Sequence, residues 1–116
     1  MGFFSRFRRF SKKLSSQYPL RVSLSSTVLG GLTWYKIEVT DKDRSKLYSI
    51  IVFSVESSTG TRKRNIVSFA VSVLEDSFNG VVVSATRSLV LLVFKSFRCS
   101  KSVKSDVVYL SRFLGV

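Results

Sequence analysis

The spacing of hydrophobic residues along the chain changes near residue 18. Before that point the apolar residues recur at intervals of three and four, which places them on one face of a helix with basic residues opposite. Tyr18-Pro19 ends this pattern, because the residue before a proline avoids the helical region. Residues 1–17 are therefore predicted to form a short amphipathic helix followed by a linker. The apolar members of the helix are Phe3, Phe7, Phe10 and Leu14.

From residue 20 onward the period is two, which indicates strands. Leu20–Val28 and Trp34–Val39 alternate apolar with polar side chains, as half-buried strands do. Gly30-Gly31 between them predicts a turn, and the polar segment Asp41–Ser45 predicts a loop. Leu47–Val55 is apolar at both alternations, so we expect a central strand that is covered on both faces.

The following segment has the spacing of an amphipathic helix. Apolar residues recur with a helical period over Ile66–Phe78 and leave serines and acids on the other side. Asn65 is a suitable N-cap, and Asn79-Gly80 is a typical helix end. We therefore predict a helix between these two signals. Its apolar face comprises Ile66, Phe69, Ala70, Val73, Leu74 and Phe78.

The last third of the chain is less regular. Val81–Val83 favours a strand, whereas Ala85–Phe97 is compatible with a strand or a helix. We favour the helix, because thirteen residues without glycine or proline are long for a strand. Val107–Leu110 is predicted as a last short strand or a turn of helix. The predicted fold class is α+β, with a basic amphipathic arm (1–17) and a single domain (18–116) in which one or two helices pack on a small antiparallel sheet.

Composition restricts the chemistry. The 116 residues include 19 Lys and Arg but only seven Asp and Glu, giving a formal charge of +12, and 45% of the residues are hydrophobic. A chain without His and with one Cys can build neither a Cys/His zinc site nor a His-based catalytic pair nor an internal disulfide. The carboxylate pairs Asp41/Asp43 and Glu75-Asp76 lack neighbouring ligands or bases in sequence. We expect a non-enzymatic protein without metal or cofactor. The longest apolar run, Leu89–Phe94, is too short to span a membrane.

The basic helix is the first candidate binding site. A cationic helix with aromatic residues on its other face can lie in a membrane interface, where each cation near anionic lipid contributes about 1 kcal/mol. The same cations could contact the phosphates of nucleic acid. In a third interpretation the phenylalanines pack on the domain and the cations are merely solvated. The predicted membrane- or anion-binding residues are Phe3, Arg6, Phe7, Arg8, Arg9, Phe10, Lys12 and Lys13.

A second basic patch comprises Arg62, Lys63 and Arg64. It could contact phosphate or act as a weak nuclear-import signal, but three cations in a loop more often form a solvated turn.

Aromatic and basic residues also mix in the predicted strands. Trp34-Tyr35 and Tyr48, with Lys36 and Lys46 nearby, are reminiscent of a sheet that binds nucleic acid. Their spacing matches no known motif of that kind. We interpret them as core residues or cross-strand pairs, which aromatic residues in strands usually are.

The order of these features resembles the matrix proteins of rhabdoviruses. The resemblance is carried by the basic start Phe3–Lys13, the strands within Leu20–Val55, and above all Arg64–Gly80 followed by the apolar segment to Phe97. It implies a compact sheet-and-helix domain that binds anionic membrane through its basic N-terminal segment and condenses the nucleocapsid. The chain is shorter than that family and lacks its proline-rich budding motif, since Pro19 is the only proline. A small accessory protein related to a matrix protein fits equally well.

The sequence thus predicts a viral matrix-like or accessory protein that binds anionic membrane surfaces, and the viral nucleocapsid, through its basic helix. The alternative is a viral protein that binds nucleic acid, such as a silencing suppressor or movement factor. Viral nucleoprotein and host proteins are the expected protein partners. The expected location is the host cytoplasm at the membrane, with the nucleus as the alternative.

Overall fold

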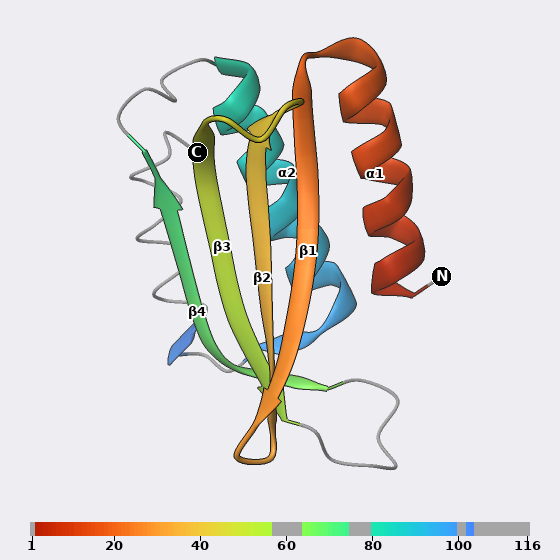
Figure 1. The fold of residues 1–116 in the computed structure, drawn as a ribbon. Coiled ribbons are helices and arrows are strands. Elements are labelled where there is room, and N and C mark those ends of the chain that lie inside the picture. Colours follow the sequence, from red (N-terminus) through yellow and green to blue (C-terminus); the bar gives the residue numbers. More distant parts are fainter. Residues whose placement is uncertain (1, 57–63, 75–79, 100–101, 104–116) are drawn as a thin grey trace.

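A computed structural model describes residues 2–56, 64–74, 80–99 and 102–103. These residues form a five-stranded sheet in the order β1-β2-β3-β4-β5, in which β1 to β4 are an antiparallel meander and β5 pairs parallel to β4 (Figure 1). The predicted α+β class is confirmed, although β5 makes the sheet mixed. The elements are α1 (Phe3–Gln17), β1 (Leu20–Leu29), β2 (Leu32–Asp41), β3 (Leu47–Glu56), β4 (Asn65–Val73), α2 (Gly80–Ser96) and β5 (Arg98–Cys99).

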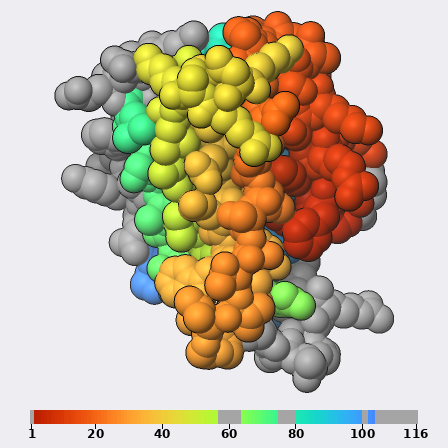
Figure 2. Space-filling view, viewed as in Figure 1, coloured from red at the N-terminus to blue at the C-terminus, as the bar shows by residue number. Residues whose placement is uncertain are grey.

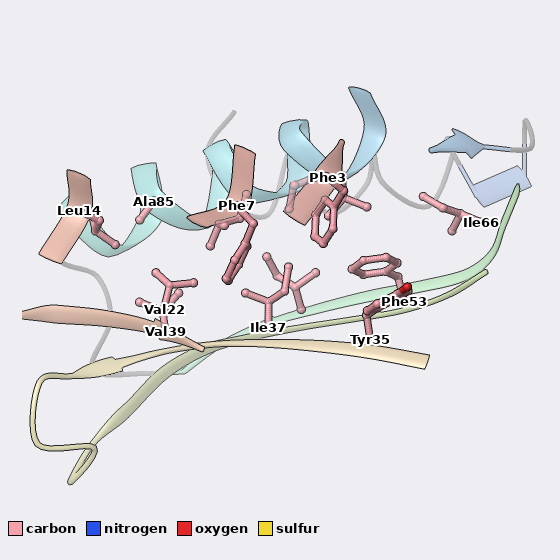
Figure 3. Packing of buried hydrophobic residues seen from close by; sticks show 14 of the residues in the cluster. Phe3, Phe7, Leu14, Val22, Tyr35, Ile37, Val39, Phe53, Ile66 and Ala85 are labelled. Atoms are coloured by element: carbon pink, nitrogen blue, oxygen red, sulfur yellow. The ribbon is translucent and has the colours of Figure 1, made fainter. Parts of the chain in front are cut away.

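Both helices lie on the same face of the sheet. Figure 3 shows side chains of α1 and α2 meeting those of the strands in one continuous core. Ile37, Ile51 and Phe53 are completely buried there, as are Leu89 and Val93 of α2. Strand side chains alternate between the two faces of a sheet. The residues between the buried ones therefore point to the face that neither α1 nor α2 covers. We call this second surface the open face.

A two-residue turn sets the register of the first hairpin. Gly30 and Gly31 have φ angles of +58° and +77°, which fit the type I′ turn that matches the twist of paired strands. The strands on either side pair from Leu29–Leu32 onward. The predicted turn and both flanking strands are confirmed.

The N-terminal helix is confirmed, but its phenylalanines do not point to solvent. Phe3 is 6% exposed and Phe7 is 8% exposed, and both belong to the core together with Leu14. The ring of Phe3 lies 6.0 Å from that of Phe53 on β3 (Figure 3). The apolar face of α1 therefore packs on the sheet, because burying three large side chains stabilises the docked helix by several kcal/mol, at about 1.5–3 kcal/mol for each. The expectation of an arm whose phenylalanines are available to a partner is wrong.

The prediction of a helix over Ile66–Phe78 is also wrong. Its first part is β4, which pairs with β3 from Val55–Ile66 to Ser49–Val73. Phe69 and Val71 pack against the core and Val73 is half-buried, whereas Ala70 and Ser72 between them are exposed. Residues 75–79 lie outside the described residues.

The remaining predictions have mixed outcomes. The predicted helix over Ala85–Phe97 is confirmed as α2, but α2 already begins at Gly80, so the strand predicted at Val81–Val83 is wrong. Valines in α2 bury against the sheet, and this packing overrides their modest helix propensity. β3 is the central strand, as predicted, and the two described helices, α1 and α2, cover one of its faces. The segment Val107–Leu110 lies outside the described residues.

Candidate nucleic-acid interface

The cations of α1 lie on the side of the helix away from the core. Arg8, Arg9, Lys12 and Lys13 are exposed and Arg6 is half-buried. Phe10 is half-buried against the core and lines a groove of about 650 Å³ between α1 and α2. Eight residues of this helix were predicted to bind an anionic surface. Four of the cations are exposed to solvent, Arg6 and Phe10 are half-buried, and Phe3 and Phe7 are buried.

Electrostatic repulsion within α1 is not relieved by the helix itself. The helix contains no acidic residue, and Gly2 at its N-cap offers no side-chain hydrogen bond to the first turn. Arg8 and Lys12 stand four residues apart on the exposed side, where two like charges destabilise a helix by about 0.2–0.5 kcal/mol. Cations near the N-terminal end also oppose the helix dipole. A bound polyanion would remove both penalties.

A basic groove runs beside α1 along the edge strand β1. It has a volume of about 650 Å³ and joins α1, the first half of β1 and the β2–β3 loop. Ser11 fixes the helix there, because its hydroxyl donates a 3.4 Å hydrogen bond to the carbonyl oxygen of Val22. The polar side chains of this groove, which we call the basic groove, are Ser11, Ser15, Arg21, Ser23, Lys42 and Arg44.

The two acidic residues next to the basic groove, Asp41 and Asp43, accept hydrogen bonds from residues of their own loop. Asp41 accepts hydrogen bonds from the Ser45 hydroxyl (2.6 Å) and the Lys46 amide (3.0 Å). The Ser45 hydroxyl, followed by the Lys46 amide, holds the pKa of Asp41 below its ordinary value of 3.8. Asp43 accepts from the Ser45 amide (3.0 Å). These bonds hold Arg44 at a φ of +61°, a region that non-glycine residues rarely adopt.

The open face carries aromatic and apolar side chains where a solvated sheet face would be polar. The register places Trp34, Lys36 and Glu38 of β2 on it, next to Val52 and Ile50 of β3. Trp34, Ile50 and Val52 are half-buried. In the view of Figure 2, atoms of β1, β2 and β3 form this surface, and neither described helix crosses it.

Lys36 on the open face and Lys46 in the β2–β3 loop both have partners. Lys36 lies 3.3 Å from a carboxylate oxygen of Glu38, and its side chain remains 50% exposed. The Lys46 ammonium lies 5.5 Å from the centre of the Tyr48 ring, in a cation–π contact. Tyr35, next to Trp34 in sequence, points the other way and stacks on Phe53 in the core. We interpreted the strand aromatics as core residues or cross-strand pairs. Tyr35 is a core residue, Tyr48 packs against the core, and Trp34 lies on the open face between its cross-strand partners Thr27 and Ser54.

The second predicted basic patch is only partly described. Arg62 and Lys63 lie outside the described residues, whereas Arg64 is exposed and its carbonyl oxygen accepts a hydrogen bond from the Arg98 amide at 3.1 Å.

The sequence analysis missed the grouping of Arg21 with Lys42 and Arg44. The polar positions of the first strand were the available signal, but only the hairpin topology brings the β2–β3 loop beside them.

Comparisons of the chain with protein-family models, curated proteins and solved structures find no match. The likeness to rhabdovirus matrix proteins therefore rests on the sequence pattern alone, and the first part of the predicted helix that carried most of it is strand β4. Among the described residues, neither helix has the length and hydropathy needed to cross a membrane, and no three metal-binding side chains come together.

Proposed function

We propose that the protein is a non-enzymatic binder of single-stranded nucleic acid. The observation that carries this proposal is the joining of two cationic surfaces: the exposed side of α1 and the basic groove share Ser11 and Ser15 as their border. Phosphates of a flexible strand could follow this path, and each neutralised phosphate would release condensed counterions.

The position of the phenylalanines favours nucleic acid over membrane as the partner. Binding of a basic helix to lipid depends on burying its apolar side, in addition to charge attraction. That side of α1 is already buried in the core, with Phe3 and Phe7 less than one-tenth exposed. A strand of nucleic acid needs no such insertion, because its phosphates are met by charges on the surface.

Binding is tested by fluorescence anisotropy with a labelled single-stranded 20-nucleotide RNA at two salt concentrations. The double variant Arg8→Ser/Lys12→Ser removes two exposed cations of α1, and Lys95→Ser/Arg98→Ser removes two exposed cations elsewhere. We expect the first variant to bind more weakly and to lower the salt slope by about 1.4, since each phosphate contact on a single strand contributes about 0.7. The second variant is expected to bind as the parent does.

The proposal is wrong if the parent does not bind RNA, or if both double variants weaken binding equally. The second outcome would mean that net charge alone governs the interaction.

An anionic membrane is a second candidate, favoured by one observation. Phe4 is 54% exposed on the first turn of α1, beside the exposed Arg8 one turn later. This single ring could enter a lipid interface without undocking the helix. Sedimentation with vesicles of phosphatidylserine, compared between the parent and Phe4→Ser, tests it. Pelleting that is unchanged by Phe4→Ser would speak against membrane insertion.

A further inference from the structure

A small pocket opens on the open face where β1, β2 and β3 lie side by side. Its volume is about 230 Å³. Thr27 pairs with Trp34, Ser25 pairs with Lys36, and Lys36 in turn pairs with Val52, so these five side chains share one face. All five line the pocket. We call it the Trp34 pocket.

The chemistry of the Trp34 pocket suits a nucleobase. The indole of Trp34 beside Val52 is a flat apolar surface on which a base could stack, as bases do on aromatic side chains in proteins that bind single strands. Ser25 and Thr27 add hydroxyls that can donate or accept hydrogen bonds. Lys36 is paired with Glu38 at 3.3 Å, but half of its side chain is exposed and an ammonium group has three donors, so it can also bind a phosphate or a base carbonyl oxygen.

The Trp34 pocket continues the basic groove. On β1, Arg21 and Ser23 line the groove, and Ser25 and Thr27 line the pocket. Alternate residues of a strand share a face, so these four side chains form one row of about 20 Å, at about 3.3 Å per residue. One strand of nucleic acid could thus lay its backbone in the groove and one base in the pocket.

We infer that the Trp34 pocket is a stacking site for an unpaired base of single-stranded nucleic acid. This inference rests on the proposed function and assigns its ligand more narrowly: the open face reads an unstacked base, while α1 and the basic groove hold phosphates.

Trp34 is the only tryptophan in the chain, so the tryptophan fluorescence comes from this pocket. The full chain is titrated with a single-stranded uridine 10-mer and, separately, with inorganic polyphosphate, which carries charge but no bases. We expect the uridine 10-mer to quench the fluorescence and polyphosphate to leave it nearly unchanged. Equal quenching by both polyanions would overturn the inference, because the change would then not come from stacking.

Substitutions separate the pocket from the rest of the surface. Trp34→Ala should weaken binding of the 10-mer roughly 5- to 150-fold, the range expected for loss of one base–aromatic stack, and Trp34→Phe should retain most of the affinity. Because Trp34→Ala could also disturb the sheet, Thr27→Glu provides a second test at an exposed position that lines the pocket. Ser72→Glu is its control, because it adds the same charge at an exposed position of β4 on the same face.

The outcomes distinguish the two proposals. If the labelled 10-mer binds by anisotropy but Trp34 fluorescence does not change, and Thr27→Glu binds like Ser72→Glu, the stacking site is wrong and the proposed function stands. If no single-stranded oligonucleotide binds at all, both are wrong. Weaker binding by Thr27→Glu than by Ser72→Glu, together with quenching, supports the site.

Discussion

The centre of the Phe3 ring lies 5.3 Å from the centre of the Phe97 ring, so the first turn of α1 contacts the residue that follows α2. Phe3 also contacts the rings of Phe53 and Tyr35, and it thereby joins both helices to the middle of the sheet. The N-terminal helix is held by its first turn as well as by Leu14 near its end.

This contact predicts a large difference between two adjacent phenylalanines. Phe3→Ala should lower the free energy of unfolding by about 3–5 kcal/mol, because it leaves a cavity among aromatic rings. Phe4→Ala should lower it by less than about 1 kcal/mol, since Phe4 is 54% exposed. Urea denaturation followed by circular dichroism measures both. Similar values for the two variants would show that α1 is not docked in solution.

A buried pair of hydroxyls connects β3 to α2. Ser49 Oγ lies 2.9 Å from Thr86 Oγ1, which donates to the carbonyl oxygen of Val82, also at 2.9 Å. Both side chains are completely buried. Thr86→Val should therefore lower the free energy of unfolding by about 1–3 kcal/mol, because it leaves the Ser49 hydroxyl without this partner. Adding Ser49→Ala should recover part of the loss, and a double-mutant cycle with no coupling would refute the pairing.

Ser54 is buried in a different situation. Its hydroxyl is completely buried and has no hydrogen-bond partner among the residues that the structure describes. Ser54→Ala removes this unsatisfied group and should raise the free energy of unfolding by about 1 kcal/mol. Ser49→Ala is the matched comparison on the same strand, and we expect it to destabilise the protein. Thermal unfolding of the two variants tests this prediction. A loss of stability in Ser54→Ala would indicate that the Ser54 hydroxyl does have a hydrogen-bond partner.

Charge reversal on α1 should separate stability from binding. Arg8→Glu places an acid four residues before Lys12 and nearer the N-terminal end of the helix. The free energy of unfolding should rise by roughly 0.5–1 kcal/mol, while affinity for single-stranded RNA falls. Lys95→Glu, at the last turn of α2, makes the same charge change with the opposite dipole effect, so it should destabilise slightly and leave binding intact. Parallel losses of binding in both variants would contradict a role specific to α1.

The β2–β3 loop should respond to acid pH. The folded pKa of Asp41 is lowered by the Ser45 hydroxyl and the Lys46 amide, so the charged form is favoured in the folded protein. Its stabilisation is therefore present above the unfolded pKa, near 4, and is lost as the pH falls through the folded pKa. Ser45→Ala should raise the Asp41 pKa toward its ordinary value. Carboxyl carbon shifts measured by NMR against pH test this, and an unchanged titration would refute the assignment.

Local patterns predicted the fold well where one period dominated. The alternation of Leu20–Val28 and the Gly30-Gly31 turn gave the first hairpin, and both strands pair as expected. The segment from Ile66 fits two periods at once: Phe69, Val71 and Val73 alternate, while Ile66, Phe69 and Val73 also follow a helical spacing. Pairing with β3, whose backbone groups need a partner on that side, selects the strand.

The candidate site was predictable only in part. A charge pattern identifies the cations of α1, but whether an amphipathic helix docks on its own domain depends on a complementary apolar surface far away in sequence. Phe53 and Phe97 supply that surface here. Likewise, alternation in β2 puts Trp34 and Tyr35 on opposite faces, but only the positions of both helices decide which face is open.

The Gly30-Gly31 turn determines which of those two rings meets solvent. If a different loop length shifted β2 by one residue against β1, every side chain of β2 would change faces. The indole would then enter the space built for the phenol, and Lys36 would point into the hydrocarbon interior. The two glycines of the turn, which have no side chains, thus determine which side chains of β2 a ligand would meet on the open face.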